Sequence, residues 1–209
     1  MSELFSEKDR VVICDDADNW LAKNGKIKAI ITSLPDMEEV GLDVDLWRSW
    51  MSRMCLRLMK SLDDDGVIVF YQTDRKYKGS IIDKKTLISS AFEYNGYKTI
   101  LSKIVLKQDP NTVNLFRPGF TNLFAFSKNT TSGKATPDVI HCGKMLYKNA
   151  MGYNACSLAV DFIATKVETD VIVDPFCGQG SVLKISNSKG FDAIGVEILE
   201  EQCVKAREL

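Results

Sequence analysis

Two glycines one residue apart follow a short apolar segment near the end of the chain. Val171–Asp174 is apolar up to its last residue and runs into Pro175-Phe176-Cys177-Gly178-Gln179-Gly180-Ser181. Gly178 and Gly180 would let backbone amides approach a ligand where a Cβ atom would clash. A helix that begins at Ser181 would present unpaired N–H groups to an anion. The segment therefore predicts a ligand-binding loop between a strand and a helix.

A carboxylate at the end of the next predicted strand supports this interpretation. Phe191–Val196 has the composition of a strand, and Glu197 follows it, about 20 residues past the loop, where a nucleotide ribose would be held. Leu183 stands where a dinucleotide fingerprint has its third glycine, which disfavours NAD. The alternative is a tight turn beside a solvated Glu197, with no ligand at all.

Further polar residues follow two predicted strands near the N-terminus. Val11–Cys14 is followed by Asp15-Asp16-Ala17, and Ala29–Thr32 is followed by Ser33-Leu34-Pro35-Asp36. In an open α/β sheet, ligands bind at the carboxyl ends of the strands. We therefore expect these residues to lie near the glycine loop.

These segments resemble a known enzyme family. Asp174–Ser181 is similar to the cofactor motif of the amino-methyltransferases that modify bases in DNA and RNA, for which Asp-Pro-Phe-x-Gly-x-Gly-Ser/Thr is characteristic. The two N-terminal segments are similar to the opening of the permuted, β-type members. The resemblance covers nearly the whole chain in order, although only the cofactor motif matches closely. It implies a Rossmann-like class I methyltransferase fold with its motifs in circularly permuted order, strands 3-4-5-6-7-1-2.

The resemblance also implies S-adenosyl-L-methionine as the cofactor and gives each motif residue a role. Asp174 would favour the cationic methionine end, which Gly178 and Gly180 would admit. Glu197 would accept both ribose hydroxyls, and Asp16 would bind the adenine edge. The implied cofactor-binding set is Asp16, Ala17, Asp174, Pro175, Phe176, Gly178, Gly180, Ser181 and Glu197.

The implied catalytic motif departs from the family's pattern. Related enzymes accept the hydrogens of the target amine on the first side chain and the second carbonyl, and stack the base on an aromatic fourth residue. The four positions here are Ser33, Leu34, Pro35 and Asp36, so the acceptors remain but Asp36 cannot stack a base. Three interpretations stay open: Asp36 is a base or acceptor for a differently presented nucleophile, an aromatic residue elsewhere supplies the stack, or the site is inactive.

Aromatic and basic residues near the same predicted sheet edge are candidates for substrate contact. Asn114–Thr121 is an irregular loop that could stack and anchor a nucleotide, or equally a hydrophobic loop held against the core. Arg75 follows the strand Val67–Tyr71 and would lie at its carboxyl end. Trp47 is a further stacking candidate. The tentative substrate residues are Tyr71, Arg75, Phe116, Arg117 and Phe120.

Short apolar runs alternate with helical patterns, which predicts one α/β domain over residues 1–209, with helices on both faces of a mixed sheet. The seven expected strands are Val11–Cys14, Ala29–Thr32, Val67–Tyr71, Thr99–Lys107, Thr121–Ser127, Val171–Asp174 and Phe191–Val196. The main expected helices are Leu46–Ser61, Lys84–Tyr94, Ala155–Thr165 and Ser181–Lys189.

Composition limits the remaining classes. Apolar runs are too short for a membrane span and the N-terminus lacks a secretory signal, so we expect a soluble protein of the cytoplasm or nucleus. Six cysteines without zinc-ligand spacing, and His141 as the only histidine, predict reduced thiols and no metal.

The substrate follows least directly from the sequence. A net charge of −1 gives no global attraction for nucleic acid but does not exclude it. The chain has no room for an inserted recognition region, so RNA is favoured over DNA, bound alone or with a partner subunit. The alternatives are methylation of a protein or small molecule, or an inactive methyltransferase-fold partner.

Overall fold

The computed structural model describes residues 8–115 and 117–209. The helices of this part are α1 (Ala17–Lys23), α2 (Met37–Val40), α3 (Val44–Ser61), α4 (Lys84–Tyr94), α5 (Tyr153–Lys166), α6 (Ser181–Ser188) and α7 (Glu200–Glu208). The strands are β1 (Arg10–Cys14), β2 (Ile27–Thr32), β3 (Leu62–Gln72), β4 (Arg75–Tyr77), β5 (Ser80–Ile82), β6 (Lys98–Leu106), β7 (Phe120–Ser127), β8 (Val139–His141), β9 (Val171–Asp174) and β10 (Asp192–Glu197).

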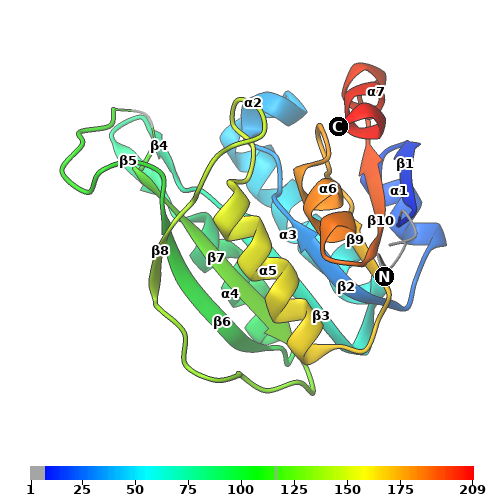
Figure 1. Ribbon diagram of the computed structural model, residues 1–209. Coiled ribbons are helices and arrows are strands. Elements are labelled where there is room, and N and C mark those ends of the chain that lie inside the picture. The colour runs from blue at the N-terminus through cyan, green and yellow to red at the C-terminus, as the bar shows by residue number, and fades with distance from the viewer. Residues whose placement is uncertain (1–7, 116) are drawn as a thin grey trace.

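One mixed sheet runs through the molecule in the order β1-β10-β9-β2-β3-β7-β6-β8 (Figure 1). Its strands are parallel except β7, which is antiparallel to both β3 and β6. Helices α1, α3 and α4 pack on one face, and α5, α6 and α7 on the other. The expected α/β sheet with helices on both faces is therefore confirmed.

The two faces of the central strands explain this layering. Consecutive residues of β3 are buried on opposite sides: Ile68 and Phe70 pack toward α3 and α4, whereas Val67 and Val69 pack toward α5. A strand buried on both faces reads as a continuous apolar run, which is the pattern that marked this segment in the sequence. None of the helices within residues 8–115 and 117–209 is long and apolar enough to cross a bilayer.

The expected count of seven strands was wrong for the main sheet, which has eight. The additional strand is β8, which pairs in parallel with the edge strand β6. The separate β4–β5 hairpin was also missed. Each of these strands has only three residues, too few to show the alternation by which a strand is recognised.

The connections between strands reverse direction at the centre of the sheet, between β9 and β2. These two strands share a single registered pair, Ile30 with Val173. The chain leaves β9 toward β10 on one side and leaves β2 toward β3 on the other. In open α/β sheets, ligands bind at the carboxyl ends of the strands on either side of such a reversal, so the fold directs attention to this edge.

Candidate functional site

The glycine loop and the acid after it face each other across the ends of β9 and β10. The Gly178 N–H donates to Glu197 Oε2 at 3.1 Å, and the Leu199 N–H donates to Glu197 Oε1 at 2.9 Å. Gly178 has a φ of +52°, and a Cβ atom there would have Tyr147 Oη, 3.6 Å away, as its nearest neighbour. The carboxylate of Glu197 is therefore held beside an open segment of backbone.

Gly180 has a packing role in the structure, and its role in admitting the cofactor stays a prediction. A Cβ atom on Gly180 would lie 3.1 Å from Cβ of Ala206 on α7, so the missing side chain lets α7 approach the loop. The glycine that lets α6 approach the sheet is on the strand. A Cβ atom on Gly195 would lie only 2.6 Å from Leu183 Cδ1, which explains why Leu183 fits where a dinucleotide fingerprint has a glycine.

Asp174 is the last residue of β9, at the carboxyl edge of the sheet. It is 4% exposed, and its Oδ1 accepts from the Thr32 hydroxyl at 2.9 Å and from the Phe176 N–H at 3.1 Å. Burial raises the pKa of Asp174 to about 7, because a charged carboxylate is disfavoured away from water. The two hydrogen bonds oppose this shift. Asp174 is thus a buried acid that titrates near neutral pH.

Asp16 lies at the tip of β1, beside the strand that carries Glu197. Cys14 is registered with Glu197, and the Asp15 N–H donates to the Glu197 carbonyl at 3.1 Å. Asp16 caps α1, since its Oδ1 accepts from the N–H groups of residues 18 and 19 at 2.9 and 3.1 Å. Ala17 is buried. The other carboxylate oxygen of Asp16 is the one left for a ligand.

Tyr147 is part of this site and was missed in the sequence. Its phenol group lies over the start of α6, where the backbone N–H groups of Gln179 and Ser181 face it, and burial raises the pKa of Tyr147. The Ser181 hydroxyl is buried and faces the same phenol. Tyr147 precedes α5 in an irregular segment, so no periodicity could have marked it.

The predicted catalytic motif, Ser33–Asp36, follows β2 and is held in place by Gln72 at the end of β3. Gln72 is a second residue that the sequence did not reveal. Gln72 is 1% exposed; its Nε2 donates to the Leu34 carbonyl at 2.8 Å, and its Oε1 accepts from the Leu34 N–H at 3.0 Å. Ser33 is exposed, and its Oγ lies 3.4 Å from Gln72 Oε1. Pro35 is half-buried, and its carbonyl accepts from Trp47 Nε1 at 3.1 Å.

Asp36 is not a free base in this structure. It is 5% exposed, its Oδ1 pairs with Lys84 Nζ, and its Oδ2 accepts from Arg117 NH2 at 2.6 Å. Its backbone N–H donates to Glu39 Oε2 at 2.6 Å. Both carboxylate oxygens are therefore engaged, because Asp36 neutralises two cations.

The aromatic residues predicted to stack on a base differ in how deeply they are buried. Tyr71 and Trp47 lie in the hydrophobic cores on opposite faces of the sheet, where they are 7% and 0% exposed. Neither side chain therefore offers a free face to a base. Burial raises the pKa of Tyr71 to about 12. Phe120 is half-buried at the start of β7, and Phe116 lies outside the described residues.

Two half-buried side chains lie beside the site, Arg75 from β4 and Phe176 from the glycine loop itself. Arg75 in β4 pairs with Glu38 of α2, and its Nε is buried without a hydrogen-bond partner among the described residues. Phe176 lies edge-on to Trp50, with ring centroids 6.0 Å apart. Arg75 is thus held near the catalytic motif through α2.

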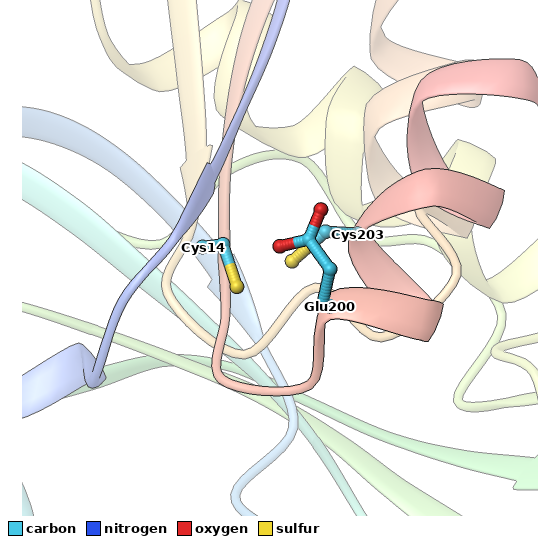
Figure 2. A group of neighbouring side chains, drawn as sticks. All are labelled: Cys14, Glu200 and Cys203. Carbon is cyan, nitrogen blue, oxygen red and sulfur yellow. The ribbon is translucent and has the colours of Figure 1, made fainter.

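Cys14, Glu200 and Cys203 gather where β1 meets α7 (Figure 2). One ligand atom of each lies within 4.8 Å of the others, and Cys203 Sγ also lies 3.3 Å from the Glu197 carbonyl. The Glu200 carboxylate and then Cys203 are the main causes that raise the pKa of Cys14 to about 12. Cys14 is far in sequence from Glu200 and Cys203, which share α7, so spacing could not predict that the three meet. The absence of a metal stays a prediction.

Comparison with known proteins gives the fold but no sequence family. The sequence matches no protein-family model and no curated relative. A putative DNA modification methylase from Thermus thermophilus, complexed with S-adenosyl-L-methionine, is similar in structure, with a TM-score of 0.74 and 17% identity over 96% of this chain and 92% of that chain.

Two further structures are similar at comparable coverage. The M1.HpyAVI–SAM complex has a TM-score of 0.66 and 17% identity, over 95% of this chain and 98% of that chain. The cytosine-N4-specific PvuII DNA methyltransferase has a TM-score of 0.73 and 14% identity, over 97% of this chain and 89% of that chain. Within this fold, the predicted cofactor residues and the catalytic motif lie at neighbouring strand ends. The chain has the fold of these methylases.

Proposed function

We propose that the chain is an S-adenosylmethionine-dependent methyltransferase that modifies an amino group of a nucleic-acid base. One observation carries the proposal: the Gly178 N–H and the Glu197 carboxylate face each other at 3.1 Å, at the carboxyl edge of the sheet, next to buried Asp174. A loop amide and a carboxylate at adjacent strand ends form the arrangement that binds a nucleoside cofactor in this class of sheet.

The residues present fit that cofactor. Glu197 can accept from ribose hydroxyls, and the backbone N–H groups at the start of α6 can donate to a polar group of the ligand. Ionised Asp174 would favour a nearby cation. When bound, the cofactor supplies an electrophilic methyl group, so the chain has mainly to position the acceptor.

The strand order supports a permuted arrangement of the motifs. In the sheet order β1-β10-β9-β2-β3-β7-β6, the two strands from the C-terminal end of the chain, β9 and β10, lie between β1 and β2. Numbered by the usual methyltransferase positions, the chain then visits strands 3-4-5-6-7-1-2. We infer that this is a circular permutation, with β8 added at the edge.

DNA is the substrate that the comparisons favour, in place of the RNA expected from the sequence. That expectation depended on the lack of a recognition region. The chain covers 92% of the Thermus thermophilus structure described as a putative DNA modification methylase, so a chain of this size does not point away from DNA. We therefore take an amino group of a DNA base as the first acceptor to test.

Two groups of the motif can still accept hydrogen bonds from a target amine. The Leu34 carbonyl has a second lone pair beyond the one that Gln72 uses, and the exposed Ser33 hydroxyl can accept. These two groups would receive the hydrogens of the target amine. Pro35 and Asp36 would only hold the turn in place, through Trp47 and the paired cations.

A specific observation favours a second candidate, an inactive methyltransferase-fold subunit that assists another chain. Asp36 occupies the position of the stacking aromatic residue and is committed to Lys84 and Arg117. Such a subunit would keep the fold and bind nucleic acid without transferring a methyl group.

Two measurements test the proposal. Calorimetric titration should show binding of S-adenosylmethionine to the wild type, weakened by Glu197→Gln by a factor on the order of tenfold, because a charged acceptor is lost. Glu200→Gln is the matched control, since Glu200 lies near but points toward Cys14. Tritium transfer from labelled cofactor into DNA, RNA and protein, assayed in parallel, should label DNA.

The remaining outcomes distinguish between the two candidate functions. Label in RNA alone would restore the RNA assignment, and label in protein alone would exclude a nucleic-acid methylase. Cofactor or DNA binding without any transfer would favour the inactive subunit. If neither ligand binds, both candidates fail.

A further inference from the structure

Three cations gather beside the catalytic motif, and the described part of the chain provides only one carboxylate that pairs with them. Lys84 Nζ and Arg117 NH2 share Asp36, as described above. Lys107, just after β6, donates to Thr73 Oγ1 at 3.1 Å and contacts no carboxylate among the described residues. Burial is the main cause that lowers the pKa of both lysines, and the charge of Arg117 lowers it further, so the three cations lie close enough to disfavour one another.

Neighbouring acids do not remove this surplus. Asp74 accepts the Lys84 backbone N–H at 3.0 Å and the Asn122 side chain at 3.4 Å. Glu39 accepts the Asp36 N–H and lies near Arg117. Neither forms an ion pair with Lys107 within residues 8–115 and 117–209.

The cations differ in access to solvent. Lys84 is 3% exposed and stays tied to Asp36, Lys107 is half-buried, and the Arg117 side chain is 44% exposed. Desolvation is the main cause that lowers the pKa of Lys107. A partly desolvated cation without a counter-ion costs free energy, which a bound anion would recover.

The half-buried Thr73 hydroxyl lies beside Lys107, next to the fully buried Thr121. Thr73 Oγ1 and Thr121 Oγ1 lie 2.5 Å apart, so one hydrogen is shared between them while Lys107 donates to Thr73. Lysine, arginine and threonine are among the groups that contact nucleic-acid phosphates. The cluster adjoins Asp36, the last residue of the catalytic motif, through Arg117. An anion bound here would therefore lie next to the amine that accepts the methyl group.

We propose that Lys107 and Arg117 bind a backbone phosphodiester next to the target nucleotide. The inference rests on the proposed function, which supplies a nucleic-acid substrate, and adds the group by which the strand is held. Lys107 acts as a point charge and Arg117 as a planar donor at the rim. Lys84 neutralises Asp36 and keeps the motif in place.

Fluorescence anisotropy with a short DNA duplex, over a series of KCl concentrations and without cofactor, tests this. Lys107→Met and Arg117→Met should each weaken binding on the order of tenfold at low salt. Each should also reduce the slope of log K against log salt by about 0.9. Lys85→Met is the matched control, because Lys85 is half-buried like Lys107 but donates to Ser102 instead.

A second readout separates binding from folding. Lys107→Met should unfold at the same or a higher temperature than the wild type, because it removes an unpaired cation; a lysine needed for the fold would show the opposite. A methylphosphonate at one linkage beside the target should weaken wild-type binding more than it weakens binding by Lys107→Met, which keeps only the Arg117 contact to that phosphate.

Unchanged salt slopes in both variants, with cofactor binding intact, would contradict this inference alone. No cofactor binding by the wild type, with the slopes changed as expected, would contradict the proposed methyl transfer and leave the phosphate site standing.

Discussion

The side-chain amide of Gln72 holds the backbone of Leu34 at both its N–H and its carbonyl, at 3.0 and 2.8 Å. In the related motif a proline would stiffen this position. Gln72, from the neighbouring strand, gives the turn two fixed hydrogen bonds instead. The altered motif is therefore held in place by a residue outside it.

Gln72→Leu should loosen the turn without affecting the cofactor site. Loss of two buried hydrogen bonds should lower the free energy of unfolding by about 1–3 kcal/mol, measured by urea denaturation. Methyl transfer should fall in kcat, with the cofactor Kd unchanged. Gln72→Glu keeps the acceptor for the Leu34 N–H but sets a buried carboxyl oxygen against the Leu34 carbonyl, so it should lose at least as much stability. An unchanged kcat in Gln72→Leu would show that the turn needs no such support.

Asp174 should make stability fall as pH rises. Its pKa is near 4 in the unfolded chain and about 7 in the folded one, so between these values the folded chain keeps a proton that the unfolded chain has released. Below this window the group has no effect, and above it the loss is complete. Asp174→Asn should remove the slope, as followed by thermal unfolding at a series of pH values.

Thr32→Val gives the matched test of the same group. It removes a hydrogen bond that favours the ionised form, so the pKa of Asp174 should rise and the window should extend upward. A profile identical to that of the wild type would mean that Thr32 does not influence this titration.

Asp36→Asn should destabilise the protein strongly. It leaves Lys84 buried without its carboxylate, which typically costs about 3–5 kcal/mol. The double variant Asp36→Asn, Lys84→Met should recover part of that loss. Glu38→Gln, which breaks the more exposed pair with Arg75, should cost less than about 1 kcal/mol. Equal losses in the two single variants would show that burial of the Asp36 pair has little effect.

Cys14 should react slowly with iodoacetamide despite its exposure. The raised pKa keeps the thiol protonated at neutral pH, and only the thiolate attacks. Glu200→Gln removes the main cause of that shift and should speed alkylation, followed by mass spectrometry of the Cys14 peptide, with Cys14→Ser as the blank. No change in rate would place the carboxylate too far away to matter.

The sequence was sufficient where local pattern and structure coincide. Val67–Tyr71 reads as a doubly buried strand and lies in the second half of β3, and the two segments that suggested a ligand site meet at the Gly178–Glu197 hydrogen bond. It was insufficient where the contact joins distant segments. Gln72 and Leu34 are 38 residues apart, and nothing around Gln72 marks it as more than the end of a strand.

The roles of charged side chains were the least predictable. Asp36 seemed available for chemistry in the sequence because its partners come from α4 and from the irregular segment before β7. Burial and pairing are properties of the assembled fold, so a motif alone cannot tell an ionised acceptor from a buried counter-ion.

The placement of β1 against β10 has a consequence for synthesis on the ribosome. Asp15 and Asp16 leave the ribosome well before Glu197 and the Gly178 loop, and among the described strands β1 pairs only with β10. This strand must therefore stay unpaired until β10 has been made. A nascent chain that has not reached β10 would be unable to retain the proposed nucleoside cofactor, so the cofactor would stabilise only chains in which β10 is present.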